Sequence, residues 1–169
     1  MPDGTAPEPE PGQFRLNCVA GDPRWQDVPD PAGLCARVAQ ACQPVINYSG
    51  ALEATVLLTD DAQVQDLNAR FRNQDKPTNV LSFANEDEQP DADSGALYLG
   101  DIAISYDTVL READETGKSL QDHLTHLIVH GVLHLAGFDH EDDAEAEDME
   151  GQEVEILLGL GIVDPYMAV

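Results

Sequence analysis

The stretch from Ser119 to Gly137 constrains the fold most, because it combines a helix start, a long apolar run and a helix stop. Ser119 and Asp122 have the spacing of a capping box, which satisfies backbone N–H groups of the first helical turn. Gly137 can adopt the left-handed conformation that ends a helix. Between these signals, apolar residues lie on nearly every face of the expected helix. Because such a helix is stable only when other elements cover it, we expect it to cross the middle of the domain.

The rest of the chain predicts short strands and amphipathic helices around this central helix. The β-prone runs lie at 14–21, 52–61, 78–86 and 96–105. Helical spacing of apolar residues occurs at 29–46, after Asp60, at 107–115 and at 143–158. Because strands and helices do not alternate regularly, we expect an α+β domain with a small mixed sheet of about four strands, covered by helices.

Three local details refine these expectations. Gly100 lies inside a strand pattern and indicates a bulge or a close backbone approach. The helix that Asp60 caps carries an apolar stripe of Val64, Leu67 and Phe71. The last helix has an acidic face, which we expect to lie in solvent.

Composition and charge exclude several classes of protein. The 169 residues predict one domain at 13–169, after a Pro-rich tail at 1–12 that we expect to be disordered. No apolar run is long enough to span a membrane, and the N-terminus lacks the basic and apolar regions of a secretory signal. The formal net charge is −25 and no Lys or Arg follows Lys118, so we expect neither a membrane surface nor DNA as a partner. Three cysteines without a C-x-x-C pair indicate a reducing cytoplasm.

The segment HGVLHLAGFDH, residues 130–140, holds three of the five histidines in the chain. Four residues advance an α-helix by about 400°, so His130 and His134 lie one above the other on the same face. A chain that turns at Gly137 can bring His140 to the same point. Three neutral imidazoles without a thiolate are typical of one divalent ion, zinc above all, in an open catalytic site.

Other ligands and other histidines leave part of this site open. A carboxylate from Asp139, Glu141 or Asp142 would instead close the site as a fourth ligand, so a structural metal remains an alternative. We expect His123 and His126, on the same helix face, to pack or to support the ligands rather than to bind the ion.

The residue after the first histidine separates two kinds of hydrolase. The histidine spacing is that of zinc peptidases of the metzincin kind, but Gly131 stands where those enzymes carry their catalytic glutamate. An RNA phosphodiester fits better, because its 2′-hydroxyl supplies a nucleophile. Such a substrate needs a cation for its phosphate, and Arg70, Arg72 and Lys76 are three of only eight Lys and Arg residues. The same cations could instead complement the dipole at a helix end.

Several motifs together resemble the YbeY-type bacterial endoribonucleases, which are rRNA maturation factors. HGVLHLAGFDH resembles the histidine motif of that family. The segments DLNARFRNQDKPTNVLSF and LGDIAIS and the helix around Met149 and Glu153 resemble three further family motifs in the right order, from about residue 50 to the C-terminus. The sequence departs from the family pattern at Asn79, Ala84 and Phe138, and the last change removes a hydroxyl close to the expected metal.

The resemblance implies a zincin-like fold with one zinc ion held by His130, His134 and His140. It also implies cleavage of single-stranded RNA, processing of 16S rRNA at its 3′ end, ribosome quality control, and ribosomal RNA and small-subunit proteins as partners. By motif position, Arg72 is the family's functional arginine. We therefore predict Arg72 and His130 as catalytic residues and Arg72, Arg70 and Lys76 as substrate-binding residues. A metallopeptidase-like hydrolase and a non-catalytic ribosome-assembly factor with a structural zinc remain the alternatives.

Overall fold

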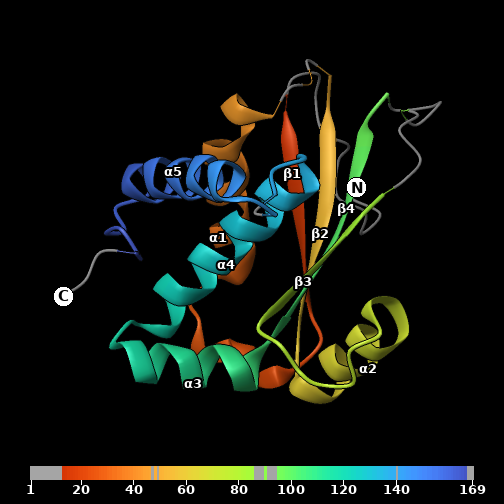
Figure 1. Cartoon of the computed structure of the whole chain (residues 1–169), viewed down its shortest axis with the longest axis vertical. Coiled ribbons are helices and arrows are strands. Elements are labelled where there is room, and N and C mark those ends of the chain that lie inside the picture. Colours follow the sequence, from red (N-terminus) through yellow and green to blue (C-terminus); the bar gives the residue numbers. More distant parts are fainter. Residues whose placement is uncertain are drawn as a thin grey trace, which may run out of the picture.

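The computed structural model describes residues 13–46, 48, 50–85, 90, 95–139 and 141–166, and within them the chain forms a four-stranded sheet with helices on both faces (Figure 1). The strands are β1 (Phe14–Ala20), β2 (Leu52–Thr59), β3 (Val80–Ala84) and β4 (Leu97–Ser105). The α-helices are α1 (Pro31–Cys42), α2 (Asp61–Arg72), α3 (Tyr106–Thr116), α4 (Leu120–Leu135) and α5 (Asp143–Gly159). Two 3₁₀ turns, η1 (Pro23–Asp27) and η2 (Gln43–Val45), complete the elements. The tail expected at 1–12 lies outside the described residues.

The sheet is mixed, with strand order β1-β2-β4-β3. β1, β2 and β4 run parallel, and β3 pairs antiparallel with β4 at the edge of the sheet. This confirms the expected α+β architecture and strand number. Gly100 forms the predicted irregularity: the β2–β4 register shifts between Glu53 and Ala54, and Gly100 has a φ of 144°. A Cβ at Gly100 would lie 2.2 Å from the carbonyl oxygen of Phe83.

The expected helix over 29–46 is shorter than predicted as an α-helix. It ends at Cys42 and continues as the η2 turn, which contains Pro44. Proline lacks the N–H that the next α-helical hydrogen bond requires, so the backbone tightens into a 3₁₀ turn instead.

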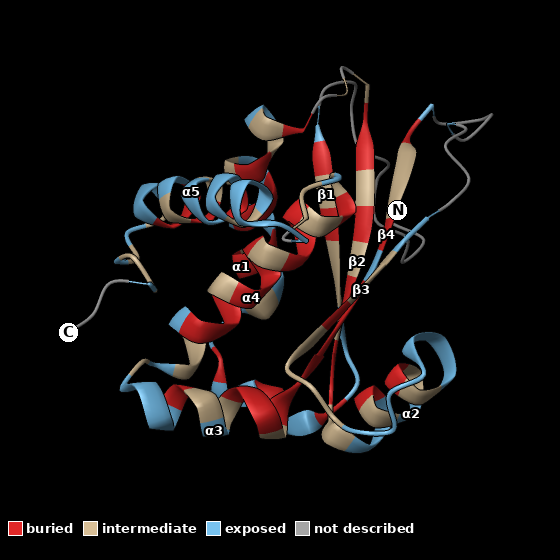
Figure 2. Ribbon diagram, in the orientation of Figure 1, coloured by how far each residue is buried: buried red, intermediate tan, exposed pale blue. Residues whose placement is uncertain are grey.

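α4 is the central helix that the sequence predicts. The Ser119 hydroxyl oxygen accepts a hydrogen bond from the Asp122 N–H at 3.0 Å, which is the expected cap. Most of the helix is buried (Figure 2), and it packs against α1, α3, α5, β3 and β4. Gly137 follows with a φ of 103°, the left-handed conformation expected of a helix stop.

Alternate residues of β4 face two separate apolar clusters. Ile102 and Ile104 belong to the main core with α4, whereas Ala103 joins Val64 of α2 and Leu81 of β3 in a small second cluster. Because successive side chains of a strand point to opposite faces, α4 and α2 cover opposite faces of the sheet. β3 therefore forms an edge that separates the two helices.

α5 follows the expected division into an apolar and an acidic face, with one exception. Met149, Ile156 and Leu157 are buried, as predicted. Glu153, an acidic residue of this helix, is 0 % exposed. Glu153 lies four residues after Met149 and three before Ile156, so it shares the buried side of the helix with them and does not belong to the acidic face. No helix in the described part of the chain is long and apolar enough to cross a membrane.

Candidate active site

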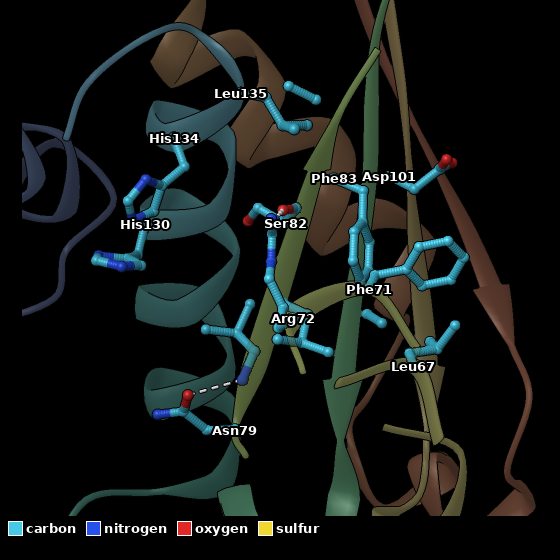
Figure 3. Close-up of a pocket in the computed structure, with 14 residues that line it drawn as sticks. Leu67, Phe71, Arg72, Asn79, Ser82, Phe83, Asp101, His130, His134 and Leu135 are labelled. Atoms are coloured by element: carbon cyan, nitrogen blue, oxygen red, sulfur yellow. Dashed lines mark hydrogen bonds between the residues drawn. The ribbon is translucent and has the colours of Figure 1, made fainter. Parts of the chain in front are cut away.

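His130 and His134 occupy successive turns of α4, as their spacing predicts. Their ring centroids lie 4.7 Å apart at an interplanar angle of 78°. Both half-buried imidazoles project from the same side of the helix (Figure 3). They line a groove of about 1000 Å³ that we call the β3 groove, since residues of α2, β3, β4 and α4 surround it, among them Phe71, Arg72 and Phe83. His140 lies outside the described residues, so the third ligand remains a prediction.

The fully buried carboxylate of Glu153 contacts the His130 ring. The Oε1 atom of Glu153 is hydrogen-bonded to Nδ1 of His130, and its Oε2 atom lies 3.1 Å from Nε2 of His126. The hydroxyl of Tyr166 donates a hydrogen bond to the same carboxylate. Burial raises the pKa of Glu153, but the hydrogen bonds from these three side chains outweigh it and hold the pKa at about 2. Glu153 is therefore ionised at neutral pH.

This contact fixes which nitrogen of His130 is suited to a metal. A carboxylate beside Nδ1 keeps a proton on that nitrogen, so an ion would bind through Nε2. Metal-binding histidines commonly have such a carboxylate partner, which orients the ring and makes it more basic. The two imidazoles and the carboxylate behind them therefore fit a divalent metal ion.

The other two histidines of α4 have the supporting positions that the sequence suggests. His126 shares the Glu153 carboxylate with His130. Nε2 of His123 lies 2.9 Å from Oε1 of Glu112, which also accepts a 3.0 Å hydrogen bond from the Asn79 side-chain amide. Asn79, one of the departures from the family pattern, thus links the start of β3 to α3 and α4.

Arg72 ends α2 and reaches across the edge of β3. Its Nη2 donates a hydrogen bond to the Ser82 carbonyl oxygen at 2.5 Å, and its Cζ lies 5.1 Å from the centroid of the Phe83 ring. Arg72 is exposed and lines the β3 groove together with His130 and His134 (Figure 3). Among the described residues that line this groove, Arg72 is the one Lys or Arg.

The other two predicted substrate-binding cations lie apart from the groove. Arg70 is exposed and forms an ion pair with Asp66 at 3.4 Å on the surface of α2. Lys76 is exposed in the turn after α2, where its carbonyl oxygen accepts a hydrogen bond from Asn68. Neither residue lines the β3 groove, so their roles in binding substrate remain predictions.

Two of the three carboxylates considered as a fourth ligand, Asp139 and Glu141, form a group with Glu145, whereas the third, Asp142, caps α5 by accepting a hydrogen bond from the Glu145 N–H at 2.8 Å. Ligand oxygens of Asp139, Glu141 and Glu145 lie within 4.8 Å of one another at the start of α5. Glu141 and Glu145 are exposed, and exposed acidic groups of this kind are common in the absence of a metal.

Gly131 packs where a peptidase would carry its glutamate. A Cβ at this position would lie 3.0 Å from both Cδ1 and Cγ2 of Ile102, a fully buried side chain of β4. A glutamate there would push α4 away from the sheet, and overpacking of this kind destabilises a core. The close contact between α4 and β4 therefore explains the glycine and argues against peptidase chemistry.

Comparison with known proteins decides the family. A family model described as Endoribonuclease YbeY matches residues 27–161 of this chain. The chain belongs to the YbeY endoribonuclease family. The YbeY-matched region contains Arg72, His130, His134 and Glu153.

Individual YbeY relatives cover most of the chain. An Endoribonuclease YbeY from Bradyrhizobium sp. is 52 % identical over 84 % of this chain and 86 % of its own length. One from Paracoccus denitrificans is 49 % identical over 99 % of this chain and 98 % of its own. The solution structure of TM1509 from Thermotoga maritima aligns with 90 % of this chain and with 99 % of its own chain. The TM-score is 0.55 and the sequence identity is 22 %, which shows a shared fold.

Proposed function

We propose that this chain is a metal-dependent endoribonuclease that cleaves single-stranded RNA. Family membership supports the reaction, since its relatives carry the name Endoribonuclease YbeY. The observation that carries the proposal is the common groove: His130, whose ring is hydrogen-bonded to Glu153, lines the same groove as Arg72. A metal ion on this histidine pair and a guanidinium in the same groove would both stabilise the negative charge that develops on a phosphodiester during cleavage.

The ion that we propose is one zinc per chain, held by His130, His134 and, by the family motif, His140. Imidazole nitrogens are suitable ligands for zinc. A divalent ion in this position would act as a Lewis acid toward a phosphoryl oxygen and make water more acidic. The residues of the chain then orient the substrate, with Arg72 placed to bind phosphate oxygens through the planar fork of its guanidinium.

Glu153 has a defined part in this proposal: it keeps His130 in the tautomer and orientation that bind the metal. Replacing Glu153 by glutamine keeps the size of the side chain but removes its charge. Supporting hydrogen bonds of this kind contribute about 10- to 100-fold to metal affinity, so we expect Glu153→Gln to bind zinc that much more weakly. Competition with a chelating dye measures the change.

The matched control for this experiment is Glu155→Gln, because Glu155 lies on the same helix and is exposed. It should leave the zinc affinity unchanged. Thermal unfolding of both metal-free variants separates a loss of folding from a loss of affinity. Equal zinc affinity of folded Glu153→Gln and wild-type protein would show that the carboxylate does not position His130.

The finer biological assignment is also part of the proposal. We propose that the RNA is ribosomal and that the processed region is the 3′ end of 16S rRNA. We further propose that the small ribosomal subunit with its proteins presents this RNA, and that the enzyme works in the cytoplasm. A chain with a net charge of −25 repels RNA at long range, and Arg72 alone of the Lys and Arg residues lines the described groove. A ribosomal partner that delivers the RNA would offset this repulsion.

The activity test uses purified, zinc-loaded protein with three substrates: a single-stranded RNA, the same sequence in a duplex, and casein. We expect cleavage of the single-stranded RNA, little cleavage of the duplex and none of casein. Chelation should abolish cleavage and added zinc should restore it. Casein cleavage with intact RNA would favour the metallopeptidase alternative, and no cleavage by folded, zinc-loaded protein would favour a non-catalytic assembly factor.

A further inference from the structure

We infer that Phe71, supported by Phe83, forms a stacking surface for an unpaired nucleobase of the RNA that is cut. The inference rests on the proposed function, because it assigns a substrate-binding role within the same groove. Phe71 belongs to the last turn of α2 and is 61 % exposed, the largest exposed aromatic fraction among the described residues. An exposed large aromatic ring beside a metal-binding pair is a candidate ligand contact.

Phe71 is the exposed last member of the apolar stripe of α2. The apolar stripe of this helix begins with Val64, which is 0 % exposed, and continues with the half-buried Leu67. Phe71, one turn further on, extends past the small cluster that Val64 forms with Leu81 and Ala103. The sequence predicts the whole stripe as a packing face, but its last member projects into the β3 groove, where the ring remains accessible.

Phe83 contacts the Phe71 ring, and Arg72 lies on the same residue of β3. The Phe71 and Phe83 rings lie 5.5 Å apart at 64°, an edge-to-face contact that fixes the tilt of Phe71. The Arg72 guanidinium lies over Phe83 at 5.1 Å and bonds the Ser82 carbonyl oxygen. The flat surface and the phosphate-binding cation are therefore neighbours on one strand edge.

The groove runs over the edge of β3 from one face of the sheet to the other. Ser82 pairs with Ile102 of β4, and Ile102 packs against Gly131 of α4, so Ser82 faces α4. Because successive side chains of a strand point to opposite faces, Phe83 points to the α2 side. Figure 3 shows His130 and His134 on one side of β3, Arg72 at the strand and the two phenylalanines beyond it. An RNA strand laid across this edge would place a phosphate near Arg72 and the histidines and a neighbouring base over Phe71.

The chemistry of the groove favours a nucleobase over another apolar ligand. The occupant must carry a flat apolar face next to a group that attracts a guanidinium, and a nucleotide combines these two features. A base can lie on Phe71 only when it is not paired, because pairing keeps it within a duplex. The stacking surface therefore gives the proposed preference for single-stranded RNA a structural cause.

The first test introduces a fluorophore at the proposed surface. Phe71→Trp keeps an aromatic face there, and the native Trp25 is 1 % exposed and hydrogen-bonded to Thr59, so it gives a constant background. A six-nucleotide 2′-O-methyl oligoribonucleotide should quench the new tryptophan in the zinc-loaded protein. An abasic oligomer of the same length should not. Equal quenching by both would show that the phosphates, and not the bases, cause the change and would overturn the inference.

The second test removes the ring. Phe71→Ala should weaken binding of the same oligomer about tenfold and raise KM for single-stranded RNA by a similar factor, with kcat little changed. Zinc content and melting temperature should remain those of the wild type. Phe71→Tyr should restore binding, because it restores a flat face. Leu158→Ala, at an equally exposed leucine (58 %) on α5, is the matched control and should change nothing.

Two outcomes separate this inference from the proposed function. If wild-type protein cleaves single-stranded RNA and Phe71→Ala binds and cleaves it equally well, the proposed stacking surface is wrong, whereas the proposed nuclease activity is retained. If the wild-type protein neither cleaves nor binds RNA, both are wrong, and Phe71 becomes a candidate contact for a protein partner.

Discussion

Replacing His130 and His134 together by alanine should remove the metal and reduce RNA cleavage to background. The two imidazoles on successive turns are the described part of the proposed ligand set. A single remaining histidine cannot hold a divalent ion against water, so we expect bound zinc to fall from about one ion per chain to near none. Elemental analysis of the purified proteins measures the zinc.

Thermal unfolding gives this prediction a second measurement. Because an ion that binds only the folded chain stabilises it by mass action, chelation should lower the melting temperature of the wild type and not that of the double variant. His123→Ala on the same helix is the control, since His123 contacts Glu112 and not the groove, and it should keep its metal. Full zinc occupancy in the double variant would contradict the proposed site.

Arg72→Ala should lower RNA cleavage on the order of a hundredfold without loss of zinc. A preorganised cation aimed at the charge that develops on a phosphate is worth about 3 kcal/mol, which corresponds to that factor in rate. Arg72→Lys should recover only part of the activity, because an ammonium group cannot form the two parallel hydrogen bonds of a guanidinium. Single-turnover cleavage of a single-stranded RNA measures the effect.

The controls for Arg72 come from its own helix. Arg70→Ala removes a cation two residues away that is paired with Asp66 outside the groove, and it should change cleavage by less than about twofold. Since Arg72 also bonds the Ser82 carbonyl oxygen, the melting temperature of Arg72→Ala must be compared with that of the wild type. Unchanged cleavage in a folded Arg72→Ala variant would leave Arg72 only the role of fastening α2 to the edge of β3.

The sequence by itself determined the central helix, the histidine pair and the segments that form strands, whereas the order β1-β2-β4-β3 in the sheet came from the structure. The cap at Ser119 and the stop at Gly137 are local signals, so the helix between them is found within a residue of its predicted ends. The four-residue spacing alone places His130 and His134 on one face. The strands were predictable because each is a short β-prone run, and their bounds agree within two residues. The mixed sheet was expected because strands and helices do not alternate regularly along the chain.

Only the tertiary structure decided which side chains lie in the site and which support it. Arg70 and Arg72 are two residues apart in α2, which separates their directions by about 200° around the helix axis. Their closeness in the sequence therefore does not predict which of the two lines the groove. Glu153 is buried in a helix whose acidic face is expected to lie in solvent, and Phe71 is exposed although it ends an apolar stripe. Burial depends on which other elements cover a position, and this is decided by the tertiary structure. α4 and Tyr166 provide the hydrogen bonds that keep the buried Glu153 ionised, whereas Phe71 contacts Phe83 of β3 and still leaves most of its ring exposed.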